Sequence, residues 1–156
     1  MKLLTAGSLA LVLIGLLPSA VQAQGSIVAW GYDNFGQVSN APGGTDFTLV
    51  AGGGEHSMAL RTDGSIVSWG YNGFGQISGT PVGPGFIQLA GGDGYSMALH
   101  SDGSLSSWGR NDHGQVSNTP GGVGFVQIDV GYHHSIALRA DGSIASWGRD
   151  SDGQIT

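Results

Sequence analysis

The sequence predicts an all-β protein, a β-propeller of which about 3.5 blades are present. Four tryptophans, Trp30, Trp69, Trp108 and Trp147, follow one another at intervals of 39 residues. In each repeat, short apolar and β-branched runs are separated by turn sequences, and the 30 glycines interrupt any helical pattern. Units of about 40 residues that hold several short strands are typical of propeller blades.

The first 23 residues differ from the rest and predict a secretory signal peptide. Met1-Lys2 gives a positive start, Leu9 to Leu17 is apolar, Pro18 follows, and Val21-Gln22-Ala23 ends in a small residue. The alternative is an uncleaved membrane anchor, because Leu3 to Val21 carries no charge and nearly reaches spanning length. We expect cleavage after Ala23 and a secreted or periplasmic location for residues 24–156.

The repeat segment, residues 24–156, divides into one half unit and three full units. Their ranges are 25–39 for the half unit and 46–78, 85–117 and 124–156 for the full ones. In the first full unit we expect four strands, at 47–51, 56–61, 65–69 and 75–78. Asp63-Gly64 separates the second strand from the third, and this pair predicts a two-residue hairpin turn with positive φ at both positions. The four tryptophans are expected to fill the space between adjacent blades.

The motifs HSMALRTDGSIVSWGYNGFGQ, YSMALHSDGSLSSWGRNDHGQ and HSIALRADGSIASWGRDSDGQ resemble the regulator of chromosome condensation repeat family. The likeness covers the chain after Ala23, and the 39-residue unit is similar to the compact bacterial versions, including the β-lactamase inhibitor protein II type. The resemblance implies a seven-bladed propeller that binds proteins through loops on one face. It also implies that His56 and His134, which share one repeat position with Tyr95, are structural and bond to backbone. No repeat carries an insertion, so nucleotide-exchange activity is not inferred from the resemblance.

Seven blades need about twice this chain. We do not expect two copies to complete a ring, because each contributes the same half unit. The alternatives are therefore a partial ring that is a fragment of a longer reading frame, or a homo-oligomer that associates through open blade edges.

Two sets of loops vary between repeats and form the predicted binding rim. Equivalent loops of successive blades lie side by side, and Tyr, Phe, Arg and His are enriched where proteins bind partners. The alternative is that these loops are only permissive turns. The rim residues are Tyr32, Asp33, Phe35, Tyr71, Asn72, Phe74, Arg110, Asp112, His113, Arg149, Asp150, Asp152, Glu55, Tyr95, Tyr132 and His133.

Other chemistry has weak support in the sequence, and we expect no catalytic residue, no cofactor and no metal. Ser135, His134 and Asp129 can be drawn as a triad, but every repeat has the same serine, which favours a structural role. Asp150 to Gly153 resembles the start of a calcium loop without its later glutamate, so calcium binding there stays open. Asp129 replaces an alanine and must face a channel or a partner.

The charge composition restricts the classes of partner that the chain is expected to bind. The net charge is −6, and only five lysines and arginines occur, without clustering. Nucleic acid and anionic membrane are disfavoured, because both require a basic face. The favoured function is a non-catalytic, exported protein-binding scaffold. The alternatives are an enzyme inhibitor of the β-lactamase-inhibitor kind and a glycan-binding or hydrolytic propeller, since Tyr32, Phe35, Tyr71 and Phe74 could stack on sugars.

Overall fold

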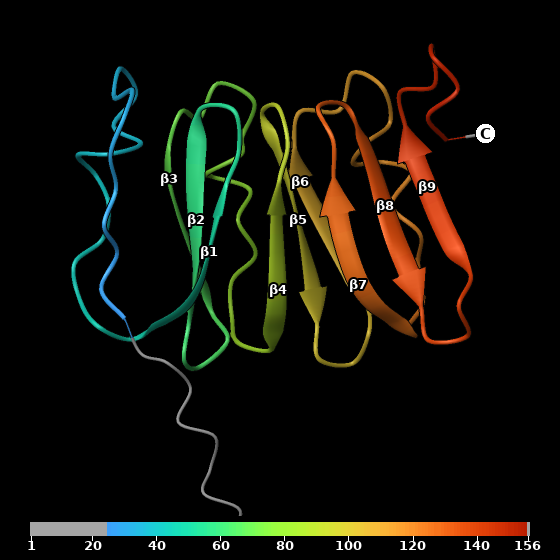
Figure 1. Cartoon of the computed structure of the whole chain (residues 1–156), viewed down its shortest axis with the longest axis horizontal. Helices are drawn as coiled ribbons and strands as arrows, with labels where there is room; N and C mark the ends of the chain where they lie inside the picture. Colours follow the sequence, from blue (N-terminus) through green and yellow to red (C-terminus); the bar gives the residue numbers. More distant parts are fainter. Residues whose placement is uncertain (1–24, 156) are drawn as a thin grey trace, which may run out of the picture.

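A computed structural model describes residues 25–155, so the predicted signal peptide lies outside the described residues. The described chain forms three antiparallel sheets of three strands, which stand side by side as an arc (Figure 1). The first blade contains β1 (Phe47–Gly52), β2 (His56–Arg61) and β3 (Ile66–Gly70); the second contains β4 (Phe86–Gly91), β5 (Tyr95–His100) and β6 (Leu105–Gly109); the third contains β7 (Phe125–Val130), β8 (His134–Arg139) and β9 (Ile144–Gly148). In residues 25–155 no helix has the length and apolar character that a membrane crossing requires. The all-β class and the partial propeller are confirmed.

The hairpin between β2 and β3 differs from the predicted turn. Among residues 25–155 only glycines have positive φ, and at Asp63-Gly64 this applies to Gly64 alone, with φ of 80°. The amide of Gly64 donates to the carbonyl of Arg61, and the amide of Arg61 donates to the carbonyl of Ser65. A turn that is followed by one left-handed glycine is the three-residue hairpin with a bulge. The Asp63 carboxylate accepts the amide and hydroxyl of Ser65, which stabilises this longer loop.

The expected fourth strand at 75–78 is wrong, because these residues form a turn. The side-chain oxygen of Asn72 accepts the amides of Ile77 and Ser78, so these donors are not free to pair with a strand. The amide of Gly79 also donates to the carbonyl of Gly75. Local side-chain bonds of this kind compete with a β-ladder. The same turn recurs around Asn111, whose oxygen accepts the amides of Val116 and Ser117.

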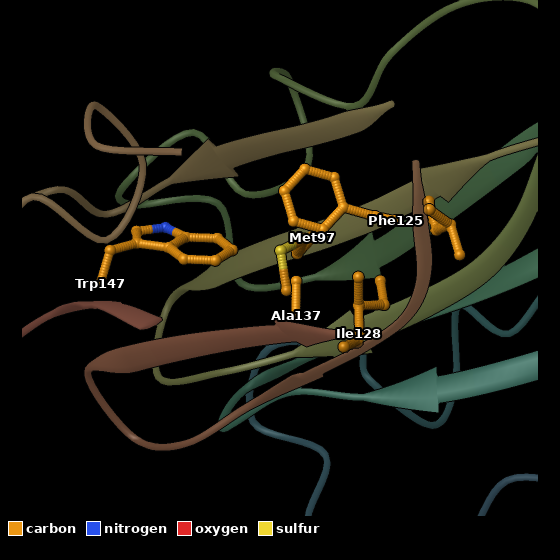
Figure 2. Packing of buried hydrophobic residues seen from close by; sticks show 7 residues of the cluster. Met97, Phe125, Ile128, Ala137 and Trp147 are labelled. Atoms are coloured by element: carbon orange, nitrogen blue, oxygen red, sulfur yellow. The ribbon is translucent and has the colours of Figure 1, made fainter. Parts of the chain in front are cut away.

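The core lies between the blades. The strand β4 packs against both β1 and β2, and β7 packs in the same way against β4 and β5. Between the second and third blades, Met97 meets Phe125, Ile128, Ala137 and Trp147, all of them buried (Figure 2). Because each blade buries its apolar face against the next one, stability depends on neighbouring repeats.

Three of the four repeat tryptophans are buried as expected. The indole nitrogens of Trp69, Trp108 and Trp147 donate to the carbonyls of Gln37, Gln76 and Gln115, which are residues of the preceding unit. The prediction is wrong for Trp30, which is 83% exposed. Among the hydrogen bonds of residues 25–155, none involves the Trp30 indole, in contrast to the other three tryptophans.

The two ends of the arc are unlike its interior. The half unit, residues 25–39, contributes no strand: its backbone pairs with β1 through an isolated bridge between Gly25 and Phe47, and Ile27 packs against the cluster of Phe47, Ala59 and Trp69. At the other end, Ile136 and Ile144 on the outer face of the third blade are 39% and 65% exposed. The equivalent of Ile136 in the second blade is Met97, which is fully buried by the following blade.

Candidate functional site

The variable loops of successive blades lie together along one edge of the arc (Figure 1). The connectors after β3 and β6 and the loops between the first two strands of each blade lie at the upper end in Figure 1, opposite the Asp-Gly hairpins. Backbone bonds join the loops: the amide of Tyr71 donates to Glu55, and the amide of Gly54 donates across the blades to Gly92. The amide of Asp93 donates in the same way to Tyr132. We call this end the loop rim.

The first part of the loop rim is a row of aromatic rings. The rings of Phe35 and Tyr71 are 4.7 Å apart and tilted, and those of Tyr71 and Phe74 meet edge to face at 6.0 Å. Phe35 and Phe74 are 38% and 45% exposed, although aromatic pairs of this kind are common in protein cores. Tyr32 is also exposed, and its hydroxyl accepts a bond from Asn34. The rim thus presents apolar rings from two successive units to solvent.

The middle of the loop rim is an ion-paired arginine. The guanidinium of Arg110 lies 4.9 Å from the centre of the Phe74 ring, so it continues the aromatic row. Its Nη1 lies 2.7 Å from Asp93, and its Nε lies 2.6 Å from Asp112. The hydrogen bond from Arg110 lowers the pKa of the Asp112 carboxyl below its ordinary value. The arginine is therefore held in place by two carboxylates.

The far part of the loop rim contains two histidines and a tyrosine. The rings of His113 and His133 are 5.0 Å apart, and Tyr132 meets His133 edge to face at 4.5 Å. Burial, together with the positive charge of Arg110, lowers the pKa of His133. Tyr132 and His113 are exposed. The sequence prediction had these three residues on one surface, and the structure brings them together.

Some predicted rim residues have their polar atoms engaged within the turns. One oxygen of Asp33 accepts the amides of Ser39 and Val38, and these bonds lower the pKa of its carboxyl. Asn72 holds the equivalent turn of the next unit, and Asp150 accepts the amide of Ile155 at the same repeat position. The carboxylate of Asp150, considered above for calcium, therefore has the role of Asn72. Arg149 and Asp152 form a loose ion pair at 3.9 Å.

Tyr95, which was predicted for the rim, is instead fully buried between blades, and its hydroxyl donates to the carbonyl of His134 at 2.6 Å. His56 has the same role one blade earlier, but its Nε2 bonds to the Ser96 hydroxyl at 2.8 Å. The expected bond from His56 to backbone is therefore wrong. Ser96 is the repeat equivalent of Ser57, so the repeat motif contains the side-chain partner of His56. This bond was not predicted from the sequence. His134 is half-buried on the outer face of the third blade.

The three residues of the possible triad are not brought together. The hydroxyl of Ser135 lies 3.3 Å from the Tyr95 hydroxyl, and one oxygen of Asp129 accepts the amide of Val130. Asp129 is exposed on the outer face of the third blade, beside Ile136 and Ile144. Sequence reasoning missed the buried glutamines Gln76 and Gln115, which anchor the tryptophans and cap the loops. Their signal was the Gly-Gln pair that recurs every 39 residues.

Comparison with known proteins agrees with the repeat pattern. Residues 47–76, 86–115 and 125–154 match the regulator of chromosome condensation (RCC1) repeat. No curated protein sequence matches the chain.

Several solved structures have a similar fold. The chain is similar to yeast RCC1 (Prp20) in its complex with Kap60, with 25% identity and a TM-score of 0.67 over 81% of this chain and 40% of that one. A structure of Prp20p from Saccharomyces cerevisiae has 25% identity and a TM-score of 0.65, over 80% of this chain and 41% of that one. The ectodomain of the receptor kinase ACR4 from Arabidopsis thaliana has 22% identity and a TM-score of 0.71, over 88% of this chain and 48% of that one. This likeness shows the fold alone. The chain thus spans less than half the length of these proteins.

Proposed function

The chain belongs to the regulator of chromosome condensation (RCC1) repeat family, and from this premise we propose that it is a non-catalytic, exported scaffold that binds a protein partner through the loop rim. Proteins of similar structure support a protein partner. One yeast RCC1 structure is a complex with Kap60, and the Prp20p structure was described with its binding to Gsp1p and histones. A binding scaffold of this kind needs a rigid framework that presents exposed loops.

The observation that carries the proposal is the continuous row from Phe35 through Tyr71 and Phe74 to Arg110. Aromatic and arginine side chains dominate the binding energy of protein interfaces. The row is fixed by backbone bonds between loops and by the ion pairs of Arg110, so little conformational entropy is lost when a partner binds. Ser135 and Asp129, two members of the possible triad, are engaged in separate structural contacts.

Replacing Tyr71 and Phe74 together with alanine is expected to weaken partner binding at least tenfold, because two rings of the row are lost. The measurement is quantitative capture from extracts of the source cells, with the wild-type and variant chains as bait. The control variant is Val82→Ala with Ile87→Ala, which removes exposed apolar side chains from the opposite end of the blades. Equal capture by the rim variant and the wild type, with both folded by circular dichroism, contradicts the proposal.

Export is tested separately. Cleavage after Ala23 is expected to leave Gln24 as the first residue of the exported protein, because small residues precede the cut. Mass spectrometry of the secreted or periplasmic fraction measures that terminus. A full-length chain that starts at Met1 and stays with the membrane would favour the uncleaved anchor instead.

A further inference from the structure

The loop rim contains a site for a guanidinium group, and Arg110 of the same chain occupies it. The guanidinium of Arg110 lies over the Phe74 ring at 4.9 Å and is held by the carboxylates of Asp93 and Asp112. A ring below and carboxylates at the side are the two contacts that favour a cation in a partly exposed place. Two other arginines make the same ring contact, Arg61 over Phe47 and Arg139 over Phe125.

One repeat earlier, the equivalent place lacks its arginine. A step of 39 residues takes Phe74 to Phe35 and Arg110 to Tyr71, so a tyrosine ring replaces the guanidinium. The same step takes Asp93 and Asp112 to Gly54 and Gly73, so the two carboxylates are replaced by glycines. The ring of Phe35 is retained, and its contact with Tyr71 at 4.7 Å produces an exposed aromatic surface in place of a filled cation site.

An acidic group without a cation partner lies beside this surface. The carbonyl of Glu55 accepts the amide of Tyr71, which fixes the backbone of Glu55 beside that of Tyr71, and the Glu55 side chain is exposed. Among the ion pairs of residues 25–155, none includes Glu55. The predicted rim residues include five carboxylates and two arginines, and the whole chain carries a charge of −6, so the surface attracts a positively charged partner.

We propose that Phe35, Tyr71, Phe74 and Glu55 form a receptor for an arginine or lysine side chain of the protein partner. The charged group of the partner lies against the exposed faces of these rings and pairs with Glu55. This inference rests on the proposed function, because it assigns partner chemistry to the same rim. It identifies the partner surface as basic and extended enough to place one cationic side chain on the aromatic row.

The test uses a peptide of defined chemistry and the exported chain. An acetylated and amidated Gly-Ser-Arg-Gly-Ser-Arg-Gly peptide is titrated into the ¹⁵N-labelled chain, in parallel with the same peptide in which citrulline replaces both arginines. Citrulline keeps the shape and loses the charge. We expect the arginine peptide to shift the amide signals of Glu55, Tyr71 and Phe74, and to bind about fivefold or more tighter than the citrulline peptide.

Two variants separate a local site from general charge attraction. Glu55→Gln is expected to weaken binding of the arginine peptide several-fold at low ionic strength. The matched control is Asp129→Asn, which removes one exposed charge from the outer face of the third blade and retains an oxygen for the Val130 amide. Equal losses in the two variants would show diffuse attraction and overturn the proposal.

The remaining outcomes are also decisive. Equal affinity for the citrulline peptide, no binding of either peptide, or shifts confined to other loops would overturn it. A different outcome would indicate a glycan site instead: a chito-oligosaccharide shifts the amide signals of Tyr71 and Phe74 in both the wild type and Glu55→Gln, and the arginine peptide does not shift them. If the peptide fails while capture of the partner still requires Tyr71 and Phe74, the cation receptor is wrong and the binding scaffold stands.

Discussion

Replacing Trp108 with alanine is expected to lower the free energy of unfolding by about 3–5 kcal/mol. The indole of Trp108 is 5% exposed and lies among Met58, Leu60 and Phe86 at the junction of the first two blades. Its removal leaves a cavity at this junction and also deprives the Gln76 carbonyl of its indole donor, which lies 2.9 Å away. Because the blades have no core of their own, the loss weakens the contact on which both depend.

The matched control is Trp30→Ala, at the same repeat position. Trp30 is 83% exposed, so its loss is expected to change the free energy of unfolding by less than about 0.5 kcal/mol. Urea unfolding followed by far-ultraviolet circular dichroism measures both variants and does not depend on the fluorescence of the deleted ring. Similar destabilisation by the two substitutions would contradict the proposed packing of the tryptophans.

Acidification is expected to remove about 3 kcal/mol of stability through His56 alone. Burial lowers the pKa of His56 from 6.5 to about 4, because the folded protein desolvates the imidazolium. The unfolded chain takes up a proton as the pH falls below 6.5, whereas the folded chain stays neutral at His56 until the pH nears 4. The stability is therefore fully present above pH 6.5, and it decreases progressively as the pH falls from 6.5 to 4.

Substitution of His56 by tyrosine isolates this effect. Tyrosine occupies the equivalent position 95 and is accommodated between blades, so the variant is expected to fold. The free energy of unfolding of His56→Tyr should decrease about 2–3 kcal/mol less than that of the wild type between pH 7 and pH 4.5. His134→Tyr makes the same substitution on the outer face of the third blade and serves as the control for the change of side chain. If both variants lose stability with acid as the wild type does, His56 is not the group responsible.

The order and bounds of most strands were predictable because each depends on local signals. The second strand, His56–Arg61, matches the prediction; the first strand is one residue longer at its end, and the third is shifted by one residue at both ends. These elements are short runs rich in apolar residues, and turn sequences such as Gly52-Gly53 and Asp63-Gly64 separate them, which is the pattern that predicts strands. The turn at 75–78 was mistaken for a strand because a propeller blade typically has four strands and Ile77 is β-branched, while the side chain that prevents pairing, Asn72, lies outside the segment.

The candidate site was predictable only in part. Repetition alone placed Tyr71, Phe74, Arg110 and His113 in equivalent loops, and in the structure all four lie on the loop rim. The repeat pattern did not reveal that Tyr95 is buried, or that Asp93 pairs with Arg110, 17 residues later. Both depend on which neighbouring blade covers a position, and one repeat read by itself does not contain that neighbour.

The sequence by itself determined the repeat, the β class, the hairpins and the residues available to the rim, because strands and turns arise from interactions within a few residues. The tertiary structure decided which copies of each repeated residue are buried. Trp108 and Trp30 share one motif, yet one lies in a core and the other in solvent. The physical reason is that a blade buries its apolar face only against another blade, so the fate of a repeated side chain depends on its place in the arc.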